Sequence, residues 1–338
     1  MPSRKGTSMD VKNVLLTGAG GKIGRALLPE LVRAGYAVRA LEYTDGLQVE
    51  RLNHVEVVVG DLRDPGLAPQ LIEDIDVVIH MANVKENKQL FLDANVKGTF
   101  YLLDACKQSG NVRQFIQAGS DARAGIYYYP QPIPIDENHR HSGYPGYYPL
   151  SKVLEEVMCE QYQIMYQTPI TILRFSWVHD EDDILSHVTL QEPNLGVPVW
   201  RDWATTPEQH AYFQQGKNAV ACLVHADGSA GQRQIVGIRD VVQSVMLAIG
   251  NPTAIGHAFN VSGPAPFAYD VLADYVAQQL DLPVVRFEVS EFHDFCIDMS
   301  KSRSVLGFQP QWDIFRIVDD AVRFRKEGKT RSTCLYPG

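Results

Sequence analysis

The feature that most constrains the fold is a run of glycines between a short apolar segment and an amphipathic one. Gly18, Gly21 and Gly24 directly follow the apolar residues 14–17, and leucines at helical spacing come after the last glycine. Glycines in this position permit a tight turn and let backbone N–H groups approach a pyrophosphate at the start of a helix. An ordinary turn is the alternative, but the order of strand, glycines and helix favours a parallel α/β fold with a dinucleotide site.

The same alternation of elements continues along the chain. Strand-length segments rich in β-branched residues recur at 37–41, 55–59, 77–80, 115–118 and 170–175, with amphipathic stretches between them. Such apolar runs suit strands buried on both faces of a parallel sheet, and repeated βα units imply right-handed crossovers. We therefore predict a Rossmann-type, doubly wound parallel sheet of the α/β class, with a smaller α/β lobe.

Residues 150–165 carry the clearest helical pattern. Glu155, Glu156 and Glu160 fall away from the apolar positions of this helix. Those apolar positions are Leu150, Val153, Leu154, Val157, Met158, Tyr162 and Met165. We expect this apolar face, like that of the helix predicted near 91–106, to pack into the core.

The regular alternation ends near residue 180. A length of 338 residues suits about two domains of roughly 150 residues each. Irregular, acidic and polar stretches follow before helical patterns return toward the C-terminus. We predict an NAD-type dinucleotide-binding domain of residues 10–180 with about 236–262, a substrate-binding lobe of 181–235 with 263–330, and a disordered extension over 1–9.

Composition narrows the classes of partner. The 31 Lys and Arg residues against 40 Asp and Glu residues give a formal charge of −9. A pI near 5.6 argues against binding to nucleic acid or to an anionic membrane, and no apolar run reaches the roughly 18 to 20 residues of a membrane span. The five cysteines lie far apart without a CxxC pair, which is typical of a reducing cytoplasm. We therefore expect a cytoplasmic protein that binds a small molecule.

Acidic residues follow two of the predicted strands. Glu42 ends the second strand at the distance where an acid meets a ribose, and a carboxylate there accepts hydrogen bonds from adenosine hydroxyls and repels a 2′-phosphate. This favours NAD over NADP. Asp61 and Leu62 follow the third strand, where a side chain reaches the adenine. The alternatives are a solvated acid for Glu42 and an ordinary turn for Asp61.

Tyr148 and Lys152 are spaced one helical turn apart, and Pro149 suits the start of a helix. A nearby ammonium stabilises tyrosinate and lowers the phenol pKa, so that Tyr148 can take a proton from a hydroxyl while hydride leaves the same carbon. A packed tyrosine beside a solvated lysine is the alternative. Ser120 follows the fifth strand, where its hydroxyl can bond a substrate oxygen; a turn serine is the other interpretation.

Further motifs occur in the same order along the chain. They are His80-Met81-Ala82, the segments 95–99 and 233–240, and the C-terminal segments 298–302 and 306–310. Together with the glycines, Glu42, Ser120, Tyr148 and Lys152, they cover the chain from 11 to about 325. The sequence resembles the extended short-chain dehydrogenase/reductase family of the NAD-dependent epimerase/dehydratase type, especially UDP-galactose 4-epimerase-like enzymes.

The resemblance implies an enzyme with Tyr148 as acid/base, Lys152 tuning it and holding the nicotinamide ribose, and Ser120 orienting the substrate hydroxyl. The cofactor NAD supplies the hydride chemistry. The implied cofactor-binding residues are Gly18, Gly21, Lys22, Ile23, Gly24, Glu42, Asp61, Leu62, Met81, Ala82, Asn95, Tyr148, Lys152 and Phe175. The implied substrate-binding residues are Asn83, Lys85, Ser120, Asp121, Arg174, Trp177 and Arg233. No metal site is expected, and residues 179–183 are interpreted as a solvated acidic loop.

The resemblance leaves the substrate open. Arg233 matches an arginine that binds substrate phosphates in nucleotide-sugar epimerases, whereas Glu288 stands where a second such arginine is usual. Arg174 matches an arginine that holds a sugar carboxylate in uronate dehydrogenases. A nucleotide-sugar epimerase is therefore favoured, with an NAD-dependent dehydrogenase of a free sugar or uronate as the alternative and a non-catalytic dinucleotide-sensing protein as a third. Family members pair the helices near 91–106 and 150–165 across a dimer, so we expect a homodimer.

Overall fold

The computed structural model describes residues 9–43, 53–190, 196 and 198–329. Its centre is a seven-stranded parallel sheet with the order β11-β6-β5-β4-β1-β2-β3. The strands are β1 (Asn13–Thr17), β2 (Ala37–Glu42), β3 (Val55–Val59), β4 (Val77–His80), β5 (Gln114–Ser120), β6 (Ile170–Phe175) and β11 (His257–Val261). The predicted α/β class with a doubly wound parallel sheet is confirmed.

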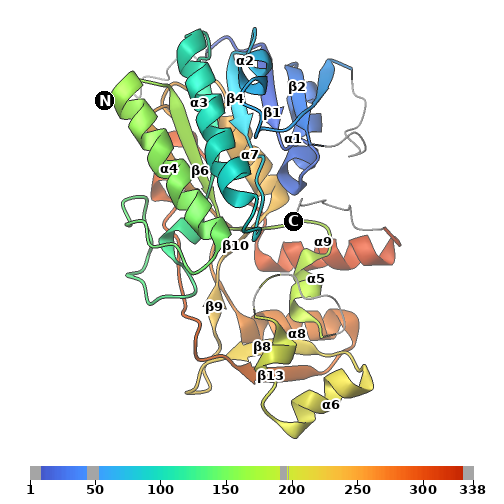
Figure 1. The fold of residues 1–338 in the computed structure, drawn as a ribbon. Coiled ribbons are helices and arrows are strands. Elements are labelled where there is room, and N and C mark those ends of the chain that lie inside the picture. The colour runs from blue at the N-terminus through green and yellow to red at the C-terminus, as the bar shows by residue number, and fades with distance from the viewer. Residues whose placement is uncertain (1–8, 44–52, 191–195, 197, 330–338) are drawn as a thin grey trace.

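Helices cover both faces of this sheet (Figure 1). On one face, α1 (Lys22–Arg33) and α7 (Ile238–Ala248) contact each other. The opposite face carries α2 (Leu67–Leu71), α3 (Gly98–Ser109) and α4 (Tyr147–Tyr166). Each face has its own apolar core, with Leu27 and Val245 in one and Leu103 and Phe115 in the other. The two cores hold the strand ends, and therefore the loops that follow them, in fixed positions.

One strand departs from the expected burial. β3 was expected to be buried on both faces, but Val57 and Val59 are 44% and 50% exposed. The reason is position, because β3 is the outermost strand and pairs only with β2 among the described strands. A run of valines at the edge of a sheet has the same sequence pattern as a run at its centre.

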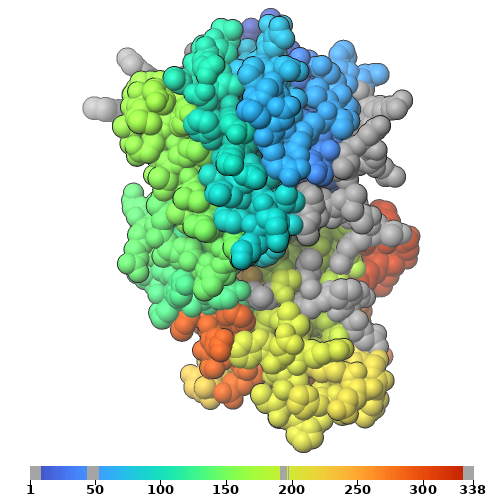
Figure 2. All heavy atoms as spheres, in the orientation of Figure 1, coloured from blue at the N-terminus to red at the C-terminus, as the bar shows by residue number. Residues whose placement is uncertain are grey.

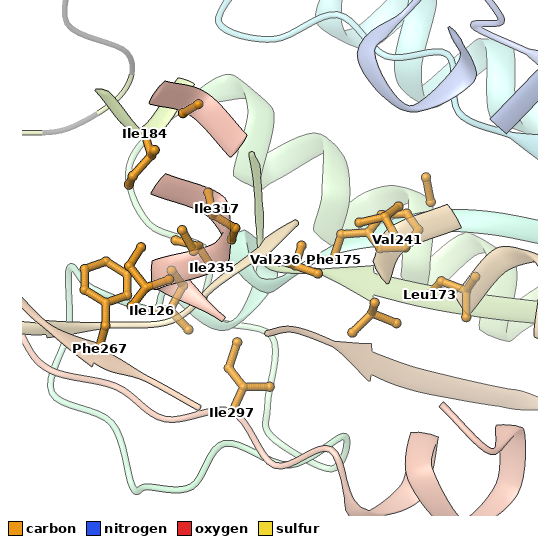
Figure 3. Close-up of a cluster of buried hydrophobic side chains, with 14 of the residues drawn as sticks. Ile126, Leu173, Phe175, Ile184, Ile235, Val236, Val241, Phe267, Ile297 and Ile317 are labelled. Carbon is orange, nitrogen blue, oxygen red and sulfur yellow. The ribbon is translucent and has the colours of Figure 1, made fainter. Parts of the chain in front are cut away.

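A smaller lobe lies below the sheet (Figures 1 and 2). It contains β8 (Val220–Val224) paired with β13 (Val284–Glu288), and the helices α5 (Asp183–Val188), α6 (Pro207–Gln215), α8 (Tyr269–Leu280) and α9 (Ile314–Lys326). Two short pairs connect it to the sheet: β7 (Trp177–His179) with β10 (Ile235–Gly237), and β9 (Gln232–Arg233) with β12 (Phe267–Ala268). Figure 3 shows side chains from both parts, including Leu173, Ile235 and Phe267, in one apolar cluster.

Helix α4 turns the opposite face to the sheet from the one expected. Leu150, Leu154 and Val157 are 46%, 37% and 37% exposed, whereas Glu155 and Glu156 are buried. The prediction that the apolar side of this helix packs into the core is wrong for Leu150, Leu154, Val157 and Met165. It is confirmed for Tyr162, which is buried, and for Met158, which packs against the core. The physical reason is that β5 and β6 present Gln117 and Arg174 to the helix, and these buried side chains require polar and charged partners. The exposed apolar side is considered below.

The acidic segment 179–183 is also buried rather than solvated. Asp183 lies at the start of α5 and is 5% exposed, with its Oδ2 2.6 Å from the Lys22 Nζ. Asp182 accepts a hydrogen bond of 2.7 Å from Arg325. Asp183 thus joins α1 of the sheet domain to the smaller lobe, and Asp182 joins α9 to the start of α5 within that lobe.

The expectations for the cysteines and for the N-terminal extension can be compared with the structure only in part. Cys106, Cys159, Cys222 and Cys296 are free, while Cys334 and residues 1–8 of the expected extension lie outside the described residues. Among the helices that are described, none has the length and hydropathy to cross a membrane.

The buried contact of α4 generates a stability prediction. Glu156 Oε1 accepts hydrogen bonds from the Arg174 guanidinium, and both side chains are at most 4% exposed. Glu156→Gln removes the counter-ion of a buried guanidinium, which costs about 3–5 kcal/mol. Urea unfolding monitored by circular dichroism measures this cost. Glu160→Gln on the same helix is the control and is expected to cost less than about 1 kcal/mol, because Glu160 is partly exposed. Equal losses in the two variants contradict the assignment.

Candidate active site

A cavity of about 620 Å³ opens at the carboxyl ends of the central strands. Every residue predicted above to bind cofactor or substrate lines it, with Arg174 as the exception. These residues come from the carboxyl ends of β1 to β6 and the segments after them, from the start of α1, from α4, and from β7 and β9. A topological switch point of a doubly wound sheet is where ligands of this fold class bind. The cavity therefore joins the two predicted sites, for cofactor and for substrate, in one space.

The glycine turn forms one end of the cavity. Gly18 has φ +68°, and a Cβ there would lie 2.7 Å from the backbone nitrogen of Ala82. A Cβ on Gly24 would lie 2.2 Å from the carbonyl oxygen of Gly18. Helix α1 begins after Gly21 without a side-chain cap, so its first N–H groups face the cavity end of the helix. This arrangement fits a pyrophosphate.

Glu42 lies at the end of β2 and is 3% exposed. Its Oε1 has no hydrogen-bond partner among the described residues. Burial raises the pKa of Glu42 to about 7, against a lowering effect of the Gly20 backbone N–H. A buried carboxyl oxygen that lacks a donor suits the hydroxyl groups of a ribose and does not suit a phosphate.

Three basic side chains of the described residues are engaged by acids. Arg39 of β2 donates to Glu56 at 2.7 Å and to the carbonyl oxygens of Leu71 and Glu73. Lys22 of α1 is held by Asp183, and Arg63 of the cavity wall is held by Asp61. None of these ion pairs favours a 2′-phosphate on the ribose, which agrees with NAD over NADP.

Asp61 and Leu62 lie on the wall next to Glu42. The Asp61 Oδ2 accepts hydrogen bonds from Arg63 at 2.8 and 2.5 Å. Leu62 is 8% exposed, and a Cβ on Gly98 would lie 3.0 Å from its Cβ. The wall predicted for the adenine thus has an apolar part and a fixed carboxylate.

Tyr148, Lys152 and Ser120 meet in the middle of the cavity. The Lys152 Nζ lies 5.7 Å from the centre of the Tyr148 ring, and the Lys85 Nζ lies 5.9 Å from it. Ser120 ends β5, and its Oγ accepts a hydrogen bond of 3.1 Å from the Ala122 N–H. The three predicted catalytic side chains are therefore side by side.

The pKa of Tyr148 departs from the expectation. Burial raises it above the ordinary value, and the lowering effects of Lys152 and of a hydrogen bond with Ser120 do not compensate. The expected net lowering is therefore wrong for the protein without ligands, because desolvation of the phenolate outweighs the ammonium. A positive charge brought into the cavity by a cofactor acts in the same direction as Lys152.

Lys152 itself is held by groups that the sequence pattern did not reveal. Its Nζ donates to the Glu155 Oε2 at 2.8 Å and to the carbonyl oxygen of Ala118 at 3.1 Å. In the amide orientation that satisfies its neighbours, the Asn83 oxygen accepts from the same Nζ at 3.1 Å. Glu155 was placed away from the core face, although its spacing of three residues from Lys152 was a signal for an ion pair.

Asn95 and His80 hold the loop after β4 in place. The Asn95 side chain exchanges hydrogen bonds of 2.8 and 2.7 Å with the backbone of Val84 and donates to Ser151 at 3.0 Å. His80 bonds Thr17 at 2.7 Å and Thr99 at 2.9 Å. The loop that carries Met81, Ala82 and Asn83 along the cavity is fixed by these contacts.

The lower end of the cavity combines an arginine, an acid and aromatic rings. The Arg233 guanidinium lies 4.4 Å from the Tyr127 ring centre and 4.2 Å from that of Trp177. Burial raises the pKa of Asp121 to about 7, while the Arg233 charge acts to lower it. Tyr128 and Tyr144 stack on each other at the same end, with centres 4.4 Å apart. The sequence patterns gave no indication that Tyr127 and Tyr144 line this cavity.

Arg174 is the predicted site residue that the structure places elsewhere. Its guanidinium is bound by Glu156 and donates to the carbonyl oxygen of Glu137 at 2.7 Å. It lines a small separate void of about 10 Å³ rather than the large cavity. The guanidinium of Arg174 is therefore bound by groups of the protein itself, away from the large cavity.

One group of possible metal ligands occurs among the described residues: His141, Glu156 and Glu160. Arg174 and Arg123 lie against Glu156, with the Arg123 Nε 3.5 Å from its Oε1. Two guanidinium groups supply the positive charge that a metal would bring, so this group carries no metal assignment.

Comparison with known proteins defines the class. Residues 14–181 match the model of the NAD dependent epimerase/dehydratase family. A putative UDP-glucose 4-epimerase of Methanocaldococcus jannaschii is 31% identical over 327 residues, which cover 93% of this chain and 98% of that protein. The uronate dehydrogenase of Pseudomonas syringae pv. tomato is 29% identical over 164 residues, covering 48% of this chain and 58% of that enzyme.

Solved structures agree on the fold. A short-chain dehydrogenase/reductase superfamily protein from Agrobacterium tumefaciens with bound NAD has a TM-score of 0.79 at 23% identity, over 94% of this chain and 98% of that one. The UDP-glucose 4-epimerase of Thermotoga maritima, solved with UDP-glucose, has a TM-score of 0.72 at 18% identity, over 94% and 99%. This chain belongs to the NAD dependent epimerase/dehydratase family, a family of enzymes. The family confirms NAD as the predicted cofactor type.

The glycine turn generates a binding prediction. Gly24→Ala places a methyl group against the Gly18 carbonyl and Ala19, so the turn must shift, at a cost of about 1–3 kcal/mol. We expect NAD affinity, measured by isothermal titration calorimetry, to fall about tenfold or more. Gly66→Ala is the control, because Gly66 has φ −75° and lies outside the cavity wall. Unchanged NAD affinity in Gly24→Ala contradicts the assignment of the turn.

Proposed function

We propose that this protein oxidises and reduces a hydroxyl carbon of a sugar with NAD, and that it acts as an epimerase of the nucleotide-sugar type. The observation that carries the proposal is the single cavity that contains both the glycine turn with Glu42 and the group of Ser120, Tyr148 and Lys152. A dinucleotide held at one end of this cavity has its reactive end near the tyrosine.

The residues have separate roles in this proposal. The glycine turn holds the pyrophosphate, Glu42 accepts the ribose hydroxyls, and Lys152 with Tyr148 faces the nicotinamide ribose. Bound NAD supplies hydride acceptance and donation. Tyr148 Oη takes the proton of the substrate hydroxyl and later returns it, while Ser120 Oγ orients the same oxygen. The domain of residues 10–180 with about 236–262 binds the cofactor, and the lobe of 181–235 with 263–330 binds the substrate.

Two features bear on the nucleotide. Arg233 is a buried cation at the substrate end of the cavity and suits a phosphate. The curated relative that matches nearly the whole chain is a putative UDP-glucose 4-epimerase. Both favour a nucleotide sugar.

A net dehydrogenase of a free sugar or uronate is the second candidate. Asp121 lies at the same end of the cavity as Arg233, and its carboxylate repels a diphosphate. The local similarity to a uronate dehydrogenase points the same way. Arg174, however, is occupied by Glu156, so a sugar carboxylate needs another cation, and Arg233 is the cation at hand.

The two candidates differ in what happens to the reduced cofactor. Purified protein with NAD is mixed separately with UDP-sugars, free sugars and uronates, and NADH absorbance and sugar isomers are followed together. Interconversion of isomers without accumulation of NADH supports the epimerase. Steady NADH accumulation with a free sugar or uronate overturns it in favour of the dehydrogenase.

The role of Tyr148 is tested by Tyr148→Phe. Loss of the acid/base group is expected to lower kcat by about 10²- to 10⁴-fold, while NAD affinity changes little. Tyr147→Phe is the matched control, because Tyr147 is the neighbouring residue and packs against Phe91, with tilted rings 5.0 Å apart, outside the cavity wall. A Tyr148→Phe variant with full activity favours a different acid/base or the non-catalytic dinucleotide-sensing function.

We also propose a cytoplasmic homodimer that pairs through α3 and α4. Exposed apolar side chains on both helices support this pairing. Leu150, Leu154 and Val157 are exposed on α4, and Phe100 of α3 is 41% exposed. A stable interface needs about 1,200 Å² or more of buried surface, which two helices from each subunit can supply.

Light scattering at micromolar concentration tests the dimer. We expect twice the chain mass of 37.8 kDa, and a monomer for Val157→Glu because a charge is then buried in an apolar interface. Val271→Glu on α8, which is also exposed, is the control and is expected to remain dimeric. A monomeric wild-type protein rules out this assembly.

A further inference from the structure

We propose that Glu155 is a positioning residue for the reaction: its buried carboxylate keeps the Lys152 ammonium charged and fixed beside Tyr148. The catalytic meaning of this assignment rests on the function proposed above. The protonation state of Lys152 does not, and it can be measured without a substrate.

The first observation is the burial of both partners. Lys152 and Glu155 are 4% and 2% exposed, and the Nζ lies 2.8 Å from the Oε2. A buried ammonium without a counter-ion is strongly disfavoured relative to the neutral amine. Glu155 is the carboxylate that bonds Lys152 in the described part of the chain.

The second observation is that the carboxylate is itself fixed. The Gln117 Nε2 donates to the Glu155 Oε2 at 2.9 Å, and Gln117 lies on β5 and is 1% exposed. The next residue of β5, Ala118, offers its carbonyl oxygen to the Lys152 Nζ. The strand therefore holds both members of the pair, and the ammonium is directed along β5 toward Ser120 at its end.

None of the other titratable groups described around Lys152 supplies a negative charge that holds its ammonium. His80 on β4 is neutral, because burial and then the Lys152 charge lower its pKa to about 3. Burial raises the pKa of the Cys159 thiol on α4, so that group is neutral too. Asp121 acts on the Tyr148 phenol and is not among the groups that act on the Lys152 ammonium. The Lys85 Nζ lies 5.9 Å from the centre of the Tyr148 ring.

The direction of the effect follows from two opposing causes. Burial lowers the pKa of Lys152, and the Glu155 carboxylate raises it, with a net result above the ordinary value. Without Glu155 the largest raising cause is lost, so Lys152 loses its proton at a lower pH. The neutral amine no longer stabilises tyrosinate, which raises the pKa of Tyr148. Loss of the Glu155 charge has a smaller, opposite effect on that pKa, because the carboxylate itself disfavours tyrosinate.

Competitive acetylation tests the proposal directly. Wild-type protein and Glu155→Gln are labelled with a trace of acetic anhydride at a series of pH values, and the peptide that contains Lys152 is quantified by mass spectrometry. The exposed Lys88 is the internal reference. We expect Lys152 to titrate above Lys88 in the wild-type protein. In Glu155→Gln we expect its reactivity at neutral pH to rise about tenfold or more, which corresponds to one pKa unit or more.

Two further variants separate the proposal from a loss of structure. Glu156→Gln removes the adjacent buried carboxylate, which Arg174 binds, and is expected to destabilise the protein without moving the Lys152 titration. Glu155→Asp keeps the charge and is expected to restore a high Lys152 pKa. A wild-type Lys152 that titrates at or below Lys88 overturns the proposal even where Glu155→Gln does not fold, as does an unchanged titration in a folded Glu155→Gln.

The pH dependence of kcat tests the catalytic role of Glu155 separately from the protonation state of Lys152. For Glu155→Gln we expect a loss of kcat that grows as pH rises, and its recovery in Glu155→Asp. A loss that is equal at every pH indicates a structural role and contradicts positioning. If Lys152 titrates as expected but Tyr148→Phe retains full activity, the ion pair stands and the proposed function fails.

Discussion

The site depends on the way α4 binds to the sheet through buried charged groups, in addition to the apolar contacts of Cys159 and Tyr162. Arg174 on β6 and Gln117 on β5 are buried, and Glu156 and Glu155 on α4 complete their hydrogen bonds. Buried charges require partners of fixed geometry. The hydrogen bonds between α4 and the two strands therefore determine the rotation of the helix about its axis. A helix held by apolar contacts alone tolerates small rotations more readily.

The rotation of α4 determines where the proposed catalytic side chains lie. Tyr148 and Lys152 lie on the same side of α4 as Glu155 and Glu156, so the face that carries charge to the sheet also presents the phenol and the ammonium to the cavity. The cost is an apolar surface left on the opposite side, where Leu150 and Leu154 are exposed. Site geometry and the proposed dimer surface are thus two consequences of one orientation.

The sequence predicted the sheet and the cavity end of each strand because these depend on local patterns. Glycine spacing, strand order and the positions of Glu42, Ser120 and Tyr148 are all local, and the structure brings them into one cavity. The orientation of α4 was not predictable from its amphipathic pattern. It depends on Arg174 and Gln117, whose need for partners is visible only when the strands lie against the helix. The edge position of β3 and the burial of Asp183 are likewise set by elements distant in the sequence.

Whether NAD binds in the same cavity as Tyr148 can be tested without knowing the substrate. Tyrosine labelled with ¹³C at the ζ carbon reports the ionisation of each phenol by NMR, and Tyr148→Phe assigns the signal. We predict that NAD lowers the pKa of Tyr148, because the positive nicotinamide ring then lies near the phenol, and that NAD leaves the titration of Tyr147 unchanged. NAD binding that leaves the titration of Tyr148 unaltered contradicts it.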